Sequence, residues 1–188
     1  MDLVSVILIG VGLSMDAFAA AICKGLSIKK NFLEKSFIIA LFFGIFQGLM
    51  PYIGYLLGSL FAEKLQVIDH WIAFVLLFII GSNMIRESKD KTCEIEDDKL
   101  DIKNLLMLSI ATSIDALAVG ISFAFLNINI GTAVFIIGIT TFLISFIGVR
   151  VGRVFGVALK DKAEIVGGLI LIFLGTKILV EHLGLLAI

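Results

Sequence analysis

The chain has 188 residues, of which 60% are hydrophobic and only 16% are charged, and its formal net charge is −1. Its mean hydropathy is +1.12, whereas ordinary soluble domains are about 45–50% apolar and about 25% charged. This composition excludes a typical soluble enzyme, and it excludes a nucleic-acid-binding protein because no basic patch is present. It predicts an all-α integral membrane protein.

Six apolar segments follow one another along the chain, and we interpret each as a transmembrane helix. They cover approximately residues 3–26, 36–61, 70–85, 103–126, 130–149 and 164–182. The one long polar stretch, residues 87–102, separates the third segment from the fourth. The sequence therefore predicts a polytopic helical bundle with little structure outside the lipid bilayer.

Positive charge predicts how these segments are oriented. The loops after the first, third and fifth segments hold 13 of the 15 Lys and Arg residues, and the other two are Lys64 and Lys177. Because basic loops stay on the cytoplasmic side, we expect these three loops to be cytoplasmic and both termini to face outward. Cys23 and Cys93 would then lie on the cytoplasmic side, where thiols stay reduced.

The two halves of the chain repeat each other. The pattern Ser-x-Asp-Ala-x-Ala occurs at residues 14–19 and again at 113–118, an offset of 99. Three segments per repeat mean that the second copy enters the membrane from the opposite side. We therefore expect an inverted repeat of residues 1–86 and 103–188, joined by a cytoplasmic loop of residues 87–102. Further pairs share an offset of 94: Gly44 with Gly138, Gly54 with Gly148, Gly58 with Gly152, Gly81 with Gly175 and Glu87 with Glu181.

Asp16 and Asp115 are the two acidic residues that fall deep inside predicted segments. A charged side chain at the bilayer centre costs at least about 2.5–3.5 kcal/mol on insertion scales, so each aspartate needs a partner or a function. One interpretation is a single cation site near the midplane to which both repeats contribute. The other is that both carboxyl groups stay protonated and only bridge helices.

Oxygen-bearing side chains accompany the two aspartates. Ser14, Thr112 and Ser113 place hydroxyl groups within one helical turn of the carboxylates. Gln47 is the most polar residue deep in the second segment, four residues before Pro51, which frees a backbone carbonyl there.

Carboxylate, hydroxyl, amide and carbonyl oxygens together suit a hard divalent cation such as Mn²⁺ or Mg²⁺. Thr140 and Thr141, at the position of Gln47 in the other repeat, are further oxygen donors. The sequence leaves open whether Lys177 reaches the membrane surface or pairs with a carboxylate. The predicted metal ligands are Asp16, Asp115, Gln47, Ser14, Ser113 and Thr112.

Four stretches resemble the MntP family of bacterial manganese efflux pumps, which is related to the LysE-type exporters. They are residues 12–20, 70–74, 112–120 and 162–168, which read GLSMDAFAA, HWIAF, TSIDALAVG and KAEIVGG. The resemblance implies export of Mn²⁺ from the cytoplasm across the bacterial inner membrane, with the two aspartates central and no cofactor. Some members of the family carry an acidic residue where this chain has Gln47, so the resemblance leaves the role of Gln47 open.

We expect a secondary-active transporter in which Mn²⁺ and protons compete for Asp16 and Asp115. Two carboxylates in a dry site repel, so one holds a proton until a cation arrives, and an inward proton gains about 2.3 kcal/mol per 100 mV. The alternatives are an exporter of small organic solutes such as amino acids on a LysE-like scaffold, and a membrane subunit without transport. No catalytic motif predicts an enzyme, and the sequence sets no oligomeric state.

Overall fold

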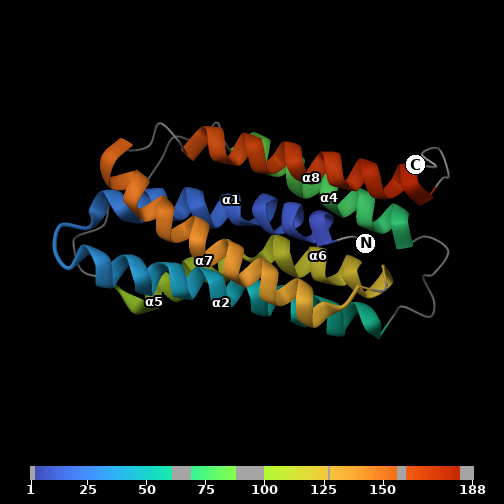
Figure 1. Cartoon of the computed structure of the whole chain (residues 1–188), viewed down its shortest axis with the longest axis horizontal. Helices are drawn as coiled ribbons and strands as arrows, with labels where there is room; N and C mark the ends of the chain where they lie inside the picture. Colours follow the sequence, from blue (N-terminus) through green and yellow to red (C-terminus); the bar gives the residue numbers. More distant parts are fainter. Residues whose placement is uncertain (1–2, 61–68, 88–99, 127, 156–159, 183–188) are drawn as a thin grey trace.

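The computed structural model describes residues 3–60, 69–87, 100–126, 128–155 and 160–182. Within these ranges all regular secondary structure is helical, which confirms the all-α prediction. The helices lie side by side along one long axis (Figure 1). They are α1 (Leu3–Ser27), α2 (Phe32–Ser59), α4 (Asp69–Glu87), α5 (Ile102–Ala111), α6 (Ile114–Phe125), α7 (Ile130–Phe155) and α8 (Lys160–His182).

Each of the six predicted apolar segments contains a helix or a pair of helices. On length and composition, α1, α2 and α7 can each cross a membrane alone, and α5 with α6 can do so as one bent span. Within the described ranges α4 and α8 fall short of that criterion. Most of the predicted cytoplasmic loop, residues 88–99, lies outside the described residues.

The fourth predicted segment is broken, which corrects the prediction of one continuous helix. α5 ends at Ala111, α6 begins at Ile114, and their axes are bent by 41°. The hydroxyl groups of Thr112 and Ser113 both donate to the Ser109 carbonyl, at 3.3 and 2.8 Å. Hydroxyls that bond nearby carbonyls compete with the helical hydrogen bonds and bend the helix, and hydropathy carries no signal of this competition.

Contacts between helices fix their directions. α1 and α7 run in the same direction, since Ser14 contacts Thr141 and, further along both helices, Ile22 contacts Gly152. α2 and α6 run parallel to each other and opposite to α1 and α7 (Figure 1). α4 runs with α1, whereas α5 and α8 run against it (Figure 1). Successive segments therefore alternate in direction.

Equivalent residues of the two predicted repeats make equivalent contacts. Gly58 lies against the Ile121 carbonyl, and Gly152 lies against the Ile22 carbonyl. The first contact becomes the second when each residue is replaced by its counterpart in the other half, since Gly58 and Gly152 differ by 94 and Ile22 and Ile121 differ by 99. Contacts related in the same way are Gly54–Leu117 with Gly148–Phe18, and Gly81–Gly168 with Gly175–Phe74.

Gly44 and Gly138 contact each other where α2 crosses α7. Because these two glycines are themselves related by the offset of 94, each is the equivalent of the other. A Cβ atom on Gly44 would lie 2.9 Å from the Gly138 carbonyl oxygen, and one on Gly138 would lie 3.1 Å from the Gly44 carbonyl oxygen. The backbones of α2 and α7 therefore come into close contact at these two glycines.

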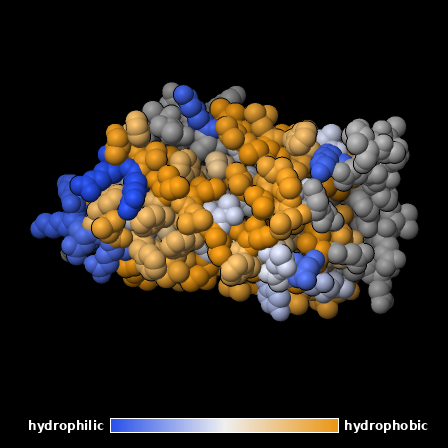
Figure 2. Space-filling view, in the orientation of Figure 1, coloured by the Kyte–Doolittle hydropathy of each residue, from blue (hydrophilic) through white to orange (hydrophobic). Residues whose placement is uncertain are grey.

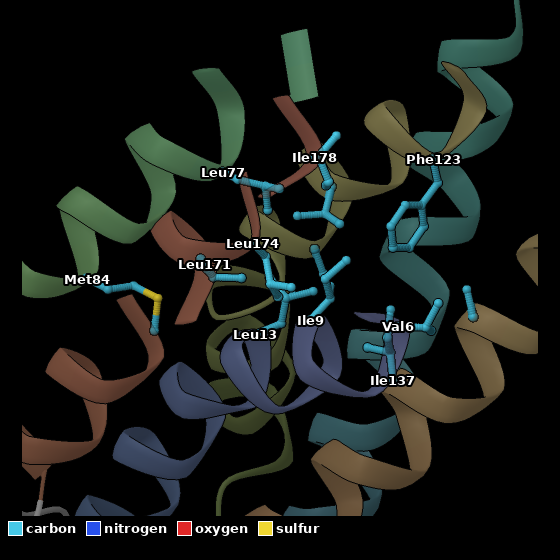
Figure 3. Packing of buried hydrophobic residues seen from close by; sticks show 13 residues of the cluster. Val6, Ile9, Leu13, Leu77, Met84, Phe123, Ile137, Leu171, Leu174 and Ile178 are labelled. Atoms are coloured by element: carbon cyan, nitrogen blue, oxygen red, sulfur yellow. The ribbon is translucent and has the colours of Figure 1, made fainter. Parts of the chain in front are cut away.

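Small residues hold the helix pairs together, and larger apolar side chains fill the space between pairs. Lipid tails are as apolar as Leu, so helices in a membrane associate mainly by close packing and by hydrogen bonds. The larger cluster lies where α1, α4, α6, α7 and α8 meet. Figure 3 shows Leu13 of α1 pointing toward Leu174 of α8 within this cluster.

The outer surface is apolar along the middle of the bundle and hydrophilic at one end (Figure 2). At that end α1, α4 and α7 finish, and α2, α5 and α8 begin (Figure 1). Arg153 of α7 lies over the Phe32 ring of α2, 4.6 Å from its centroid. We call this the basic end; its described basic residues are Lys24, Lys29, Lys30, Lys35, Arg86, Lys103, Arg150, Arg153 and Lys162.

Replacing Gly54 with alanine is expected to destabilise the bundle, because the new Cβ would overlap the Leu117 carbonyl where α2 packs on α6. Overpacking of this kind costs about 1–3 kcal/mol. Gly131→Ala is the matched control, since its Cβ would meet only the Asn129 side chain, at 3.5 Å. The thermal unfolding midpoint of detergent-purified protein should fall for Gly54→Ala and not for Gly131→Ala. Equal midpoints for both variants would contradict the close packing of α2 on α6.

Candidate functional site

Gln47 is a fully buried polar side chain in the middle of the bundle. It lies on α2, which packs on α6 and α7. Pro51 follows one turn later inside the same helix, so the Gln47 backbone carbonyl lacks its usual donor. An amide at such depth is tolerated when its hydrogen bonds are made inside the protein.

The Gln47 side chain joins the two Ser-x-Asp stretches. Its Nε2 atom donates to the backbone carbonyl of Leu13, the residue before Ser14, at 3.2 Å. Its Oε1 atom lies 2.8 Å from the Ser113 hydroxyl, whose one hydrogen it shares with the Ser109 carbonyl. One amide therefore bridges α1 to the break between α5 and α6, and both of its polar atoms take part.

The contact between Ser14 and Thr141 is equivalent to the contact between Ser113 and Gln47. The two hydroxyl oxygens lie 2.9 Å apart, and Ser14 also donates to the Gly10 carbonyl. Either hydroxyl can be the donor in the contact between Ser14 and Thr141. Ser14 and Ser113 differ by 99, and Gln47 and Thr141 differ by 94. The Ser14–Thr141 contact therefore corresponds to the Ser113–Gln47 contact in the other predicted repeat. The structure thus brings these four predicted residues together in two pairs.

Asp115 lies in the first turn of α6, directly after the break, and it is half-buried. Its Oδ1 atom accepts a hydrogen bond from the backbone N–H of Ala116 at 2.7 Å. A helix N-terminus exposes N–H groups and carries partial positive charge, which favours an anionic side chain there. The break therefore lowers the cost of holding this carboxylate deep in an apolar bundle. Thr112, by contrast, uses its hydroxyl on the Ser109 carbonyl.

Asp16 has a different setting, because α1 continues through its Ser-x-Asp stretch without a break. The side chain is half-buried and lies near the middle of the helix. On either side of it, Ala17 is fully buried and Met15 packs against Gly167 of α8. The equivalent aspartates of the two halves thus differ, since Asp115 has a helix N-terminus and Asp16 does not.

The sequence patterns do not single out two buried polar residues near this site. Glu164 on α8 is only 6% exposed and its Oε2 atom is buried, although hydropathy places it at the start of a segment. No sequence signal marks it, because its burial follows from the packing of α8 on α1. Ser145 on α7 is fully buried, and its hydroxyl has no hydrogen-bond partner among the described residues. It follows Thr141 by one turn and shares its helix face.

The structure gives one contact of Lys177 and the bonding state of Cys23. The Lys177 Nζ atom donates to the Ser5 hydroxyl at 3.3 Å. Ser5 precedes Asp16 by 11 residues, about 16 Å of helix. Cys23 is bonded in a disulfide, which contradicts the expectation of a reduced thiol. Cys93 lies outside the described residues.

The side chains in the predicted ligand set carry oxygen atoms of the kinds that bind hard cations. The Gln47 amide, the Ser113 hydroxyl and the Leu13 carbonyl are joined by hydrogen bonds, and amide, hydroxyl and carbonyl oxygens, like the carboxylates of Asp16 and Asp115, are ligands that Mg²⁺, Ca²⁺ and Mn²⁺ prefer. Nowhere in the described part of the chain do three or more His, Cys, Asp or Glu side chains form a group that could hold a metal ion.

Residues 30–179 match the sequence profile of the Mntp family, described as "Putative manganese efflux pump". A protein of Acetivibrio thermocellus named "Putative manganese efflux pump MntP" is 58% identical over 100% of this chain and 95% of its own. Proteins with the same name from Desulfitobacterium hafniense (59% identical, 95% of each chain) and Campylobacter jejuni (53% identical, 97% of this chain and 98% of its own) also match. No solved structure gives a significant match.

Replacing Gln47 with leucine should destabilise the protein more than replacing Thr141 with valine. Gln47→Leu removes two interhelical hydrogen bonds and Thr141→Val removes one. Such bonds average about 0.6 kcal/mol in membrane proteins and reach about 1.7 kcal/mol, so we expect a loss of about 1–3 kcal/mol for the first variant and about half for the second. Unfolding in mixed detergent micelles measures both. A smaller loss for Gln47→Leu than for Thr141→Val would contradict the bridging role of Gln47.

Proposed function

The chain belongs to the Mntp family of manganese efflux pumps, and we propose that it exports Mn²⁺ from the cytoplasm by secondary-active transport. The observation that carries this proposal is the Gln47 bridge, which ties two Ser-x-Asp stretches together inside an apolar bundle. Its relatives in three bacterial species carry the name of a manganese efflux pump. Polar and acidic groups at membrane depth mark ion pathways in other proteins.

The proposed architecture is six membrane spans arranged as two inverted three-helix repeats. Support comes from the alternating directions of the described segments, and from helix contacts that exchange under the offsets of 94 and 99. The contact between Gly44 and Gly138 would lie on the axis that relates the halves. Many secondary transporters use this architecture and bind their substrates between the repeats.

The proposed orientation places the basic end in the cytoplasm and both chain termini outside the bacterial inner membrane. Nine described Lys and Arg residues gather at that end. Positively charged segments next to membrane spans stay on the cytoplasmic side. The ion would therefore enter near the Lys24 end of α1 and leave near the opposite end of the bundle.

The proposed ligands are the carboxylates of Asp16 and Asp115, with the hydroxyls of Ser14, Ser113 and Thr112 and the oxygen of Gln47 as neutral donors. Mn²⁺ would displace a proton from a carboxylate on the cytoplasmic side, and a proton from outside would displace Mn²⁺ there. In a site shielded from water, a carboxylate without a cation favours its protonated form. Each inward proton would then supply free energy for export against a gradient.

Asp16→Asn and Asp115→Asn are each expected to abolish export, because asparagine cannot exchange a proton for a cation. Cells that carry either variant should accumulate Mn during growth in added Mn²⁺ to the level of cells without the protein. Elemental analysis of washed cells measures this, with Thr176→Ala as the control for expression, since Thr176 is an exposed side chain on α8. Wild-type Mn content in both aspartate variants would overturn the proposal. Sensitivity to amino acids instead of metals would favour a solute exporter.

Proton coupling predicts that an inward proton gradient accelerates efflux. Proteoliposomes loaded with Mn²⁺ should release it faster when the medium is more acidic than the lumen, since protons then move inward as Mn²⁺ moves out. The reverse gradient should slow release, and a protonophore should remove the difference. Efflux that ignores the imposed gradient would contradict the coupling while leaving Mn²⁺ export itself intact.

A further inference from the structure

The two Ser-x-Asp stretches meet at Gln47 and then diverge from it. Leu13 of α1 and Ser113 before α6 both hydrogen-bond to Gln47. α1 continues from Leu13 toward the basic end, and Asp16 lies three residues further along. α6 runs from Ser113 toward the opposite end, and Asp115 lies two residues further along. The two aspartates therefore lie on opposite sides of the Gln47 side chain along the bundle axis.

α7 packs on both α1 and α2. The depth of Asp16 along the bundle axis can therefore be expressed as the α7 residue that lies at the same level. Ser14 contacts Thr141, and α1 and α7 run parallel. Asp16, two residues after Ser14, is therefore level with about residue 143 of α7.

The depth of Asp115 follows from α2 in the same way. Ser113 contacts Gln47, and α2 and α6 run parallel, so Asp115 is level with about residue 49 of α2. The neighbouring Gly48 lies against Val134 and Gly138 of α7, which runs antiparallel. Asp115 is thus level with about residue 135 of α7. Eight residues of helix separate the two levels, about 12 Å at 1.5 Å per residue.

This separation is too large for one ion to bind both carboxylates. α1 and α6 are also displaced sideways, since packed helices lie about 8–10 Å apart, and the two Cα atoms are then about 14 Å or more apart. An aspartate oxygen reaches about 3.5 Å from its Cα, and a metal–oxygen bond adds about 2.1 Å. A single bridged ion would require Cα atoms no more than about 11 Å apart on those lengths.

Glu164 places a second carboxylate on the Asp16 side of Gln47. α8 runs antiparallel to α1, with Gly167 against Met15 and Leu171 against Gly12. Glu164 lies one turn before Gly167 on the same buried face of α8, toward the basic end, and its side chain is 6% exposed. It is therefore within about one helical turn of Asp16 in depth.

We propose that the transport path holds two cation sites in series, divided by Gln47. The inner site, toward the basic end, uses Asp16 and Glu164, and the outer site uses Asp115. The inner site has two carboxylates and balances the charge of a divalent cation, whereas the outer site has one at a helix N-terminus. The inner site therefore binds more tightly than the outer site, which suits capture on one side and release on the other. This inference rests on the proposed function, and it replaces a single shared site with two.

Mn²⁺ binding to the full chain in lipid nanodiscs tests this arrangement. Electron paramagnetic resonance measures the free Mn²⁺ that remains at each total concentration. Asp16→Asn and Asp115→Asn should each keep one Mn²⁺ site, and the double variant should keep none. Thr176→Ala is the control and should bind as wild type does. Complete loss of binding in either single variant would overturn the two-site arrangement.

Glu164→Gln separates the two sites further. It should weaken Mn²⁺ binding about tenfold or more in the Asp115→Asn background, where only the inner site remains. In the Asp16→Asn background it should leave the outer site unchanged. An equal effect in both backgrounds would overturn the assignment of Glu164 to the inner site. A wild type that binds no Mn²⁺ would instead contradict the proposed function, so the two failures are distinguishable.

Discussion

Close contact between helix backbones at glycine is the interaction on which the rest of this bundle depends. Gly58 and Gly152 lie against carbonyl groups of the facing helices, and Gly44 and Gly138 touch each other. At such short range a serine or threonine hydroxyl, which stands close to its own backbone, can reach a side chain on the next helix. The Ser14–Thr141 contact is possible only because α1 and α7 approach in this way. The polar centre is therefore a consequence of the small-residue packing around it.

The two halves make several equivalent helix contacts but differ in the hydrogen bonds of the polar centre. Thr141 reaches one partner on α1, whereas the longer Gln47 reaches both Leu13 and Ser113. The helix break also occurs only at the second Ser-x-Asp stretch. A strictly symmetric carrier would hold its ion equally well from both sides. Differences of this kind are what allow the two ends of a transport path to bind the same ion with different strength.

The sequence predicted the helical class and the positions of the segments, whereas the hydrogen bonds of Ser14 and Ser113 to Thr141 and Gln47 come from the structure alone. Asp16 and Asp115 were recognisable because a carboxylate in an apolar segment is costly. Glu164 was not, since its burial depends on how α8 packs on α1 and not on the hydropathy of its neighbours. The break at Thr112 was equally hidden, because it arises from hydroxyl groups that compete for the Ser109 carbonyl.

Electrostatics gives a reason for dividing the path. Two charges 4 Å apart interact by about 4 kcal/mol at an effective dielectric constant of 20, and at 12 Å by about 1.4 kcal/mol. Two carboxylates in one site would have to exchange protons together, whereas carboxylates in two sites about 12 Å or more apart would do so nearly independently. An acidic residue at position 47 would lie between Asp16 and Asp115 and create a third position at which the ion could bind. In the proposed two-site path, the neutral amide of Gln47, with both polar atoms already bonded, would instead act as a barrier between the sites that has to move before the ion can pass.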